Sequence, residues 1–111
     1  MNAPTDDDDK LEALRRLRGG PRDGALLRVS LANAHLARAQ TDDAVAELRH
    51  ALDFDPDYSA AWKLLGKTLE RADAAAACDA YRAGIAAATR RGDKQAAREM
   101  NVFLRRLEKT G

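Results

Sequence analysis

Apolar side chains recur along most of the chain at intervals of three and four residues, a spacing that places them on one face of an α-helix. Near the C-terminus, for example, Ala96, Met100, Phe103 and Leu107 follow this spacing. The pattern predicts helices over approximately residues 10–18, 25–38, 42–54, 59–70, 74–90 and 94–109. The three prolines lie outside these segments, so none of them interrupts a predicted helix.

The composition of these segments favours helices over strands. Alanine dominates the apolar fraction, whereas β-branched and aromatic residues are scarce. Ala, Leu, Arg and Glu are strong helix formers, while strands are enriched in Val, Ile, Thr and Tyr. The links between segments are short, so consecutive helices are expected to lie antiparallel to one another. The sequence therefore predicts an all-α fold of five to six helices.

The N-terminal stretch DDDDK, Asp6–Lys10, has two interpretations. It matches a protease site that is often built into expression vectors, although no histidine run precedes it. It also places acids before the apolar strip of Leu11, Leu14 and Leu17, which is followed by arginines. Helix dipoles favour this order of charges, so we expect a short native helix that ends at the stretch GGPRDG. The vector-derived site stays open as the alternative.

Length, charge and cysteine content narrow the class of protein. A chain of 111 residues suits one small domain. Its net charge is only +1, and its sequence lacks the basic stripe of a nucleic-acid-binding module. No apolar run approaches the roughly 18 residues of a membrane span, and no apolar leader follows Met1. The lone Cys78 fits a reducing compartment. We therefore expect a cytoplasmic protein without nucleic-acid or membrane partners.

Two parts of the sequence repeat one another. When Ala25 is placed over Ser59, the first helices of the two parts align without a gap, and Ala32 falls on Gly66. Deleting one residue in the following turn also aligns the second helices. Ala44, Leu48 and Ala51 then fall on Ala77, Tyr81 and Gly84.

The aligned positions resemble the tetratricopeptide repeat (TPR), a helix–turn–helix unit of about 34 residues with the pattern Trp-x2-Leu-Gly-x2-Tyr, Ala-x3-Phe and a closing proline. The first copy lacks the tryptophan, and the second lacks the closing proline. The matching positions are Leu31, Ala32, Ala44, Leu48, Ala51 and Pro56 in the first copy, and Trp62, Leu65, Gly66, Leu69, Ala77, Tyr81 and Gly84 in the second.

The resemblance implies a fragment of a right-handed α-solenoid built from antiparallel helix pairs. Repeats would occupy residues 25–58 and 59–92. Residues 1–24 would form an acidic tail, a short capping helix and a Gly/Pro linker, and residues 93–111 a second capping helix. Caps are expected because two repeats leave apolar faces that need covering.

The resemblance also implies a non-enzymatic protein–protein interaction module that binds a peptide or helix in a concave groove. Asn33 matches the asparagine with which some TPR domains clamp a peptide's terminal carboxylate, whereas Val29 stands where those domains carry a lysine. By register, the groove residues are Leu26, Val29, Asn33 and Leu36, then Ala60, Lys63, Lys67, Glu70 and the adjacent Arg71, and finally Asn101 and Arg105 on the last helix.

Sites for metals, cofactors or catalysis are not indicated. Asp53, Asp55 and Asp57 alternate as in a calcium loop, but Tyr58 stands where glycine is needed and Leu64 where a bidentate glutamate is needed. We therefore interpret this stretch as a helix end followed by acids that favour the next helix.

The remaining candidate nucleophiles and metal ligands do not belong to a recognisable catalytic or metal-binding motif. His35 and His50 lie in different predicted helices without other ligands at metal-binding spacing, and Cys78 sits in an alanine run, where it is expected to pack as a small apolar residue. No phosphate-binding loop or catalytic triad is recognisable. We expect no enzyme, no cofactor and no metal.

Two functional hypotheses stay open. In the first, Leu26, Val29 and Leu36 contact the apolar part of a partner segment, while Lys63 and Lys67 contact its acidic end. In the second, the chain is a structural, self-associating protein that forms a homodimer through the last helix, where a symmetric contact covers Phe103 and Leu107. The expected assembly state is a monomer or a weak homodimer. A nucleic-acid surface is less favoured. It would consist of Arg90, Arg91, Arg98, Arg105 and Arg106.

Gly66 needs an explanation of its own, because glycine inside a helix costs about 1 kcal/mol relative to alanine. The register assigns Gly66 to a position where the two helices of one repeat approach closely, with Trp62 filling the adjacent space. The segment that contains both residues is therefore expected to be scaffold, and any binding site is expected on the neighbouring face.

Overall fold

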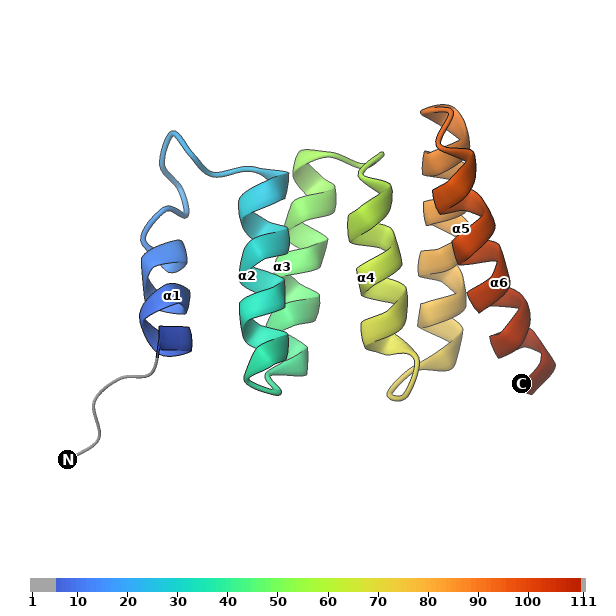
Figure 1. Cartoon of the computed structure of the whole chain (residues 1–111), viewed down its shortest axis with the longest axis horizontal. Helices are drawn as coiled ribbons and strands as arrows, with labels where there is room; N and C mark the ends of the chain where they lie inside the picture. Colours follow the sequence, from blue (N-terminus) through green and yellow to red (C-terminus); the bar gives the residue numbers. More distant parts are fainter. Residues whose placement is uncertain (1–5, 111) are drawn as a thin grey trace. The chain divides into compact units, whose positions relative to one another are not determined.

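The computed structural model describes residues 6–110 of the chain, and within this range the fold is all-α (Figure 1). The helices are α1 (Asp6–Arg15), α2 (Ala25–Ala37), α3 (Thr41–Phe54), α4 (Ser59–Leu69), α5 (Ala74–Arg90) and α6 (Lys94–Thr110). The order of the helices and the bounds of α2 to α6 follow the periodicity of the sequence closely. The prediction of an all-α fold is thus confirmed.

The helices form two compact units, which in the described part of the chain comprise residues 6–54 and 55–110. In unit 1, α2 packs against both α1 and α3, and in unit 2, α5 packs against both α4 and α6 (Figure 1). The pairs α2–α3 and α4–α5 are the helix pairs of the two predicted repeats. The predicted flanking helices correspond to α1 and α6, each of which packs on the repeat helices of its own unit.

The N-terminal helix begins earlier than the periodicity predicts, at Asp6 rather than near Lys10. Asp6–Asp9 therefore form its first turn, where negative charge is favoured by the helix dipole. The helix ends at Arg15, and the chain continues in turns closed by the hydrogen bond from the Leu17 N–H to the Leu14 carbonyl, 3.1 Å.

Helix ends in the rest of the chain have identifiable causes. The Asp73 and Asp93 side chains each accept a hydrogen bond of 3.0 Å from the backbone N–H three residues further on, which caps α5 and stabilises the start of α6. Gly92 follows α5 with φ +75°, a conformation that glycine adopts without strain. Pro56 lies in the link before α4, as predicted.

Each unit has its own apolar core. In unit 1, Leu11 of α1 packs with Leu27 and Leu31 of α2, while Leu48 of α3 is fully buried. In unit 2, the core contains Tyr81, Ala88, Met100 and Leu104, and Trp62 packs against it.

The close approach predicted at Gly66 is confirmed. A Cβ atom at Gly66 would lie only 2.7 Å from Cζ of Tyr81 on α5, which is far inside normal contact distance. A Cβ at Gly84 would likewise lie 2.7 Å from Cβ of Trp62. Glycine therefore allows α4 and α5 to approach closely at two points.

Candidate functional site

The exposed side of α2 in unit 1 carries four of the predicted groove residues. They are spaced three, four and three residues apart, which aligns them along the helix. Leu26 leaves 71% of its surface exposed, Asn33 is exposed, and Val29 and Leu36 are half-buried. The structure thus brings this part of the predicted set together in one mostly apolar strip, which we call the α2 strip: Leu26, Val29, Asn33 and Leu36.

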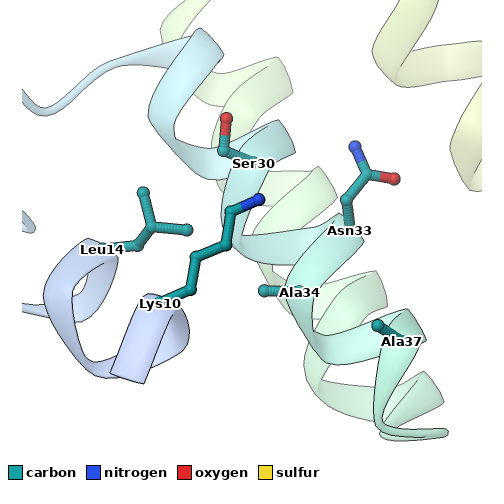
Figure 2. Close-up of a pocket in the computed structure, with 6 residues that line it drawn as sticks. All are labelled: Lys10, Leu14, Ser30, Asn33, Ala34 and Ala37. Carbon is teal, nitrogen blue, oxygen red and sulfur yellow. The ribbon is translucent and has the colours of Figure 1, made fainter. Parts of the chain in front are cut away.

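A cavity of about 310 Å³ opens beside the α2 strip, between α1 and α2. Figure 2 shows the Lys10 side chain reaching from α1 toward Ser30 and Asn33 of α2. The cavity is lined by Lys10, Leu14, Ser30, Asn33, Ala34 and Ala37. Asn33 therefore belongs to both the strip and the cavity, where its amide can donate and accept hydrogen bonds.

Lys10 is a site residue that the sequence did not reveal. It lies outside the repeats, in a segment whose main signal was its charge and its likeness to a protease site. Only the packing of α1 on α2 brings it to Asn33. A helical spacing argument within one segment cannot detect such a contact.

In unit 2, the predicted groove lysines are engaged by α6. The Lys63 ammonium forms an ion pair of 3.0 Å with Glu99, and the Lys67 ammonium lies 3.9 Å from the centroid of the Phe103 ring. The hydrogen bond from Lys63, followed by one from Gln95, lowers the pKa of Glu99 below its usual range. An acidic peptide end would have to compete with Glu99 for Lys63.

Glu70 has a structural contact as well. Its carboxylate accepts a hydrogen bond of 2.6 Å from the Tyr81 hydroxyl, whose ring is completely buried. Burial, followed by this bond to a carboxylate, raises the pKa of Tyr81 well above its ordinary value. Glu70 thereby supplies the acceptor that a buried phenol needs. The adjacent Arg71 is exposed.

The structure does not bring Asn101 and Arg105 next to the lysines of α4. The side of α6 that contacts α4 is marked by Glu99 and Phe103. Asn101 and Arg105 share helical spacing with Glu108, which pairs with Arg82 of α5 at 3.1 Å. They therefore lie on the side of α6 that faces away from α4.

Other residues singled out in the sequence have local partners. Asp55 and Asp57 pair with Arg91 and Arg90 at 2.7 and 2.5 Å, so these carboxylates hold the end of α5 to the link before α4. The ring Nδ1 of the buried His35 lies 2.8 Å from the Gln40 side-chain oxygen. The Cys78 thiol is half-buried and packs against the core of unit 2.

We predict that Lys63→Met raises the pKa of Glu99 toward that of an unpaired glutamate, because it removes the main hydrogen bond to the carboxylate. An NMR pH titration of the Glu99 side chain measures this shift. Lys109→Met, on an exposed lysine of the same helix, is the matched control and should leave the titration unchanged. An unaltered Glu99 titration in Lys63→Met would contradict the contact.

The arrangement of helices defines a small all-α protein built from packed helix hairpins. A family profile described as tetratricopeptide repeat matches residues 25–68. A TPR repeat-containing protein of Pseudomonas aeruginosa is 42% identical over 100 residues, which cover 89% of this chain and 95% of the relative. The chain belongs to the tetratricopeptide repeat family.

Solved structures agree with this assignment. A solution structure of a Bordetella parapertussis protein matches with a TM-score of 0.76 and 44% identity, covering 99% of this chain and 91% of that one. A crystal structure of a tetratricopeptide repeat domain protein from Salinibacter ruber matches with a TM-score of 0.73 and 29% identity, covering 80% and 100%. The resemblance drawn from the repeat register is confirmed.

Membership of the family indicates a general class of function. TPR repeats generally mediate protein–protein interactions, and proteins of the family are typically non-enzymatic scaffolds. Within the described part of the chain, no helix is both long and apolar enough to cross a bilayer.

Proposed function

We propose that unit 1 binds a peptide segment or helix of a partner protein along the α2 strip. The observation that carries the proposal is the exposed Leu26, 71% accessible, on the same side of α2 as the open cavity at Asn33. Exposed apolar side chains grouped next to a concave surface are typical of peptide-binding faces. Among the described residues, the exposed large apolar residues are Leu26, Phe54 and Val102, and Leu26 is the most exposed of them.

The chemistry of the strip suits an apolar partner segment. Leu26, Val29 and Leu36 offer aliphatic contacts, and the Asn33 amide can pair with a backbone N–H or carbonyl of the partner. Lys63 and Lys67 contribute less to this proposal than the sequence suggested, because Glu99 and Phe103 already engage them.

The self-association hypothesis receives less support from the structure. Phe103 and Leu107 are half-buried and pack against the core of unit 2, so they present less apolar surface than the sequence suggested. Phe103 is further covered by the cationic ends of Lys67 and Arg106.

The test begins with a pull-down from the source cells, followed by calorimetry with the purified partner. We expect Leu26→Asp combined with Asn33→Ala to weaken binding by about tenfold or more. Removing an apolar leucine from water on binding is favourable, and an aspartate at the same contact forfeits this gain. Both residues are exposed, so the variant should keep its fold.

Two controls sharpen this experiment. Val102→Asp changes another exposed aliphatic side chain, in unit 2 and 55% exposed, and should leave the affinity unchanged. A double variant Lys63→Glu with Lys67→Glu tests the basic part of the earlier hypothesis. Binding that depends on these lysines and not on Leu26 would refute the α2 strip as the site.

A further inference from the structure

Among the described residues, the acidic side chains of α6 form ion pairs, whereas its basic side chains do not. Its sequence holds five basic residues and two acids, Glu99 and Glu108. Both acids are engaged inside unit 2, Glu99 by Lys63 of α4 and Glu108 by Arg82 of α5. The basic residues of α6 are Lys94, Arg98, Arg105, Arg106 and Lys109. None of these five takes part in an ion pair within the described part of the chain.

Three of these cations share one side of the helix. Lys94, Arg98 and Arg105 are separated by four and seven residues, so they align along α6 over about 16 Å. All three are exposed, and the half-buried Asn101 lies in the same line. We call Lys94, Arg98, Asn101 and Arg105 the α6 basic line.

A cavity of about 300 Å³ opens at the N-terminal end of this line, where α5 meets α6. Lys94 and Arg98 contribute its charges, while Gly92, Ala97 and Thr89 complete its lining. The cavity therefore combines two cations with room for a small apolar side chain. The α6 basic line lies in unit 2 and is positively charged, whereas the α2 strip lies in unit 1 and is mostly apolar.

The neighbouring arginines at the end of α5 do not extend this surface. Arg90 and Arg91 are held by Asp57 and Asp55. Asp93, the acid next to Lys94, lines a different cavity together with Lys63 and Glu99 on the α4 side. Where α5 meets α6, the basic side chains that lie outside the ion pairs of the described residues are thus those of α6.

We propose that the α6 basic line docks an acidic amphipathic helix of a partner protein. Carboxylates spaced four and seven residues apart on such a helix would match the spacing of the three cations, and one adjacent apolar side chain would enter the cavity. A nucleic acid fits less well. Among the described aromatic residues, Phe103 is the ring nearest in sequence, and it is covered by Lys67 and Arg106 rather than free to stack on bases.

The probe is a fluorescent alanine-based helical peptide of about 16 residues, with glutamates spaced four and seven residues apart and one leucine beside the first. A peptide in which glutamine replaces each glutamate is the control. Anisotropy should show that the glutamate peptide binds, that the glutamine peptide does not, and that added salt weakens binding. No binding of the glutamate peptide below about 1 mM, or equal binding of both peptides, would overturn the proposal.

The matched pair of protein variants changes net charge equally. Arg98→Glu with Arg105→Glu should weaken peptide binding by about tenfold or more, because two attractive pairs become repulsive. Arg22→Glu with Arg49→Glu, two exposed arginines of unit 1, should leave it within about twofold. Equal weakening by both variants would show binding to net charge and overturn the proposal.

A duplex DNA of about 16 base pairs completes the test. We expect it to bind more weakly than the glutamate peptide at physiological salt. Tighter DNA binding that the Arg98→Glu, Arg105→Glu variant abolishes would replace the protein partner with a nucleic acid. Circular dichroism of each variant checks that the total helix content matches that of the wild-type chain.

Discussion

Replacing Arg28 with methionine is expected to lower the free energy of unfolding of unit 1 by about 3 kcal/mol. The Arg28 guanidinium bonds Asp23 at 2.9 Å and Glu47 at 3.1 Å, and only 13% of its side chain is exposed. Glu47 on α3 is also buried, with 6% of its side chain exposed, and its second contact comes from Arg18. Without Arg28, a buried carboxylate loses its best-shielded partner. Urea unfolding followed by circular dichroism measures the loss.

Two further variants separate the ion pair from simple packing. Arg28→Met combined with Glu47→Leu should recover part of the loss, because Glu47→Leu removes one of the two buried carboxylates that Arg28 pairs with, whereas Asp23, 7% exposed, still lacks its partner. Arg22→Met removes an exposed arginine nearby and should change stability by less than about 0.5 kcal/mol. The interpretation fails if the double variant is less stable than Arg28→Met alone.

The same network predicts how the stability of unit 1 falls in acid. The hydrogen bond from Arg28, followed by one from the Gly19 N–H, holds the pKa of Asp23 well below its usual range. Because the folded state depresses this pKa, the stabilisation is complete above the pKa of an unfolded aspartate, about 3.9, and is lost as the pH falls below it. Arg28→Met should therefore show a flatter decline of stability in acid than the wild-type chain.

Replacing Gly66 with leucine is expected to destabilise unit 2 by about 2–3 kcal/mol. Helix propensity alone predicts the opposite sign, a gain of about 1 kcal/mol. The Tyr81 ring occupies the space that any side chain at position 66 would need, and this ring is itself fully buried and bonded to Glu70. The ring therefore cannot move aside without breaking that bond.

The matched control for Gly66 isolates propensity from packing. Ala86 is exposed on α5, so Ala86→Gly should cost about 1 kcal/mol through propensity alone. Thermal and urea unfolding of both variants give the two numbers on one scale. A Gly66→Leu chain more stable than wild type would show that α4 and α5 do not approach as described.

Most of the fold could be predicted because its determinants are local. The helices α2 to α6 follow apolar spacing, and Gly24, Pro56 and Gly92 mark the start of α2, the link before α4 and the end of α5. The repeat was identified from aligned small and apolar positions in both helices, among them Ala32 on Gly66 and Ala44 on Ala77. The start of α1 at Asp6 was less accessible, because an acidic first turn has no apolar residue to mark it.

The candidate site was only partly predictable, because long side chains can contact residues that are distant in sequence. Leu26 and Asn33 were assigned from the repeat register that the family resemblance implies, and the structure leaves both exposed on α2. The pairing of Lys63 with Glu99, 36 residues further on, depends on how α6 packs beside α4. The contribution of Lys10 to the Asn33 cavity depends in the same way on how α1 packs on α2.

The single tryptophan of the chain gives unit 2 an optical signal of its own during unfolding. Trp62 lies in unit 2, packs against the Tyr81 core and donates a hydrogen bond of 2.8 Å to the Pro56 carbonyl. Its fluorescence therefore reports on α4 to α6, whereas far-ultraviolet circular dichroism reports on all the helices. Coincident curves would describe one cooperative transition and separated curves two, without any added label.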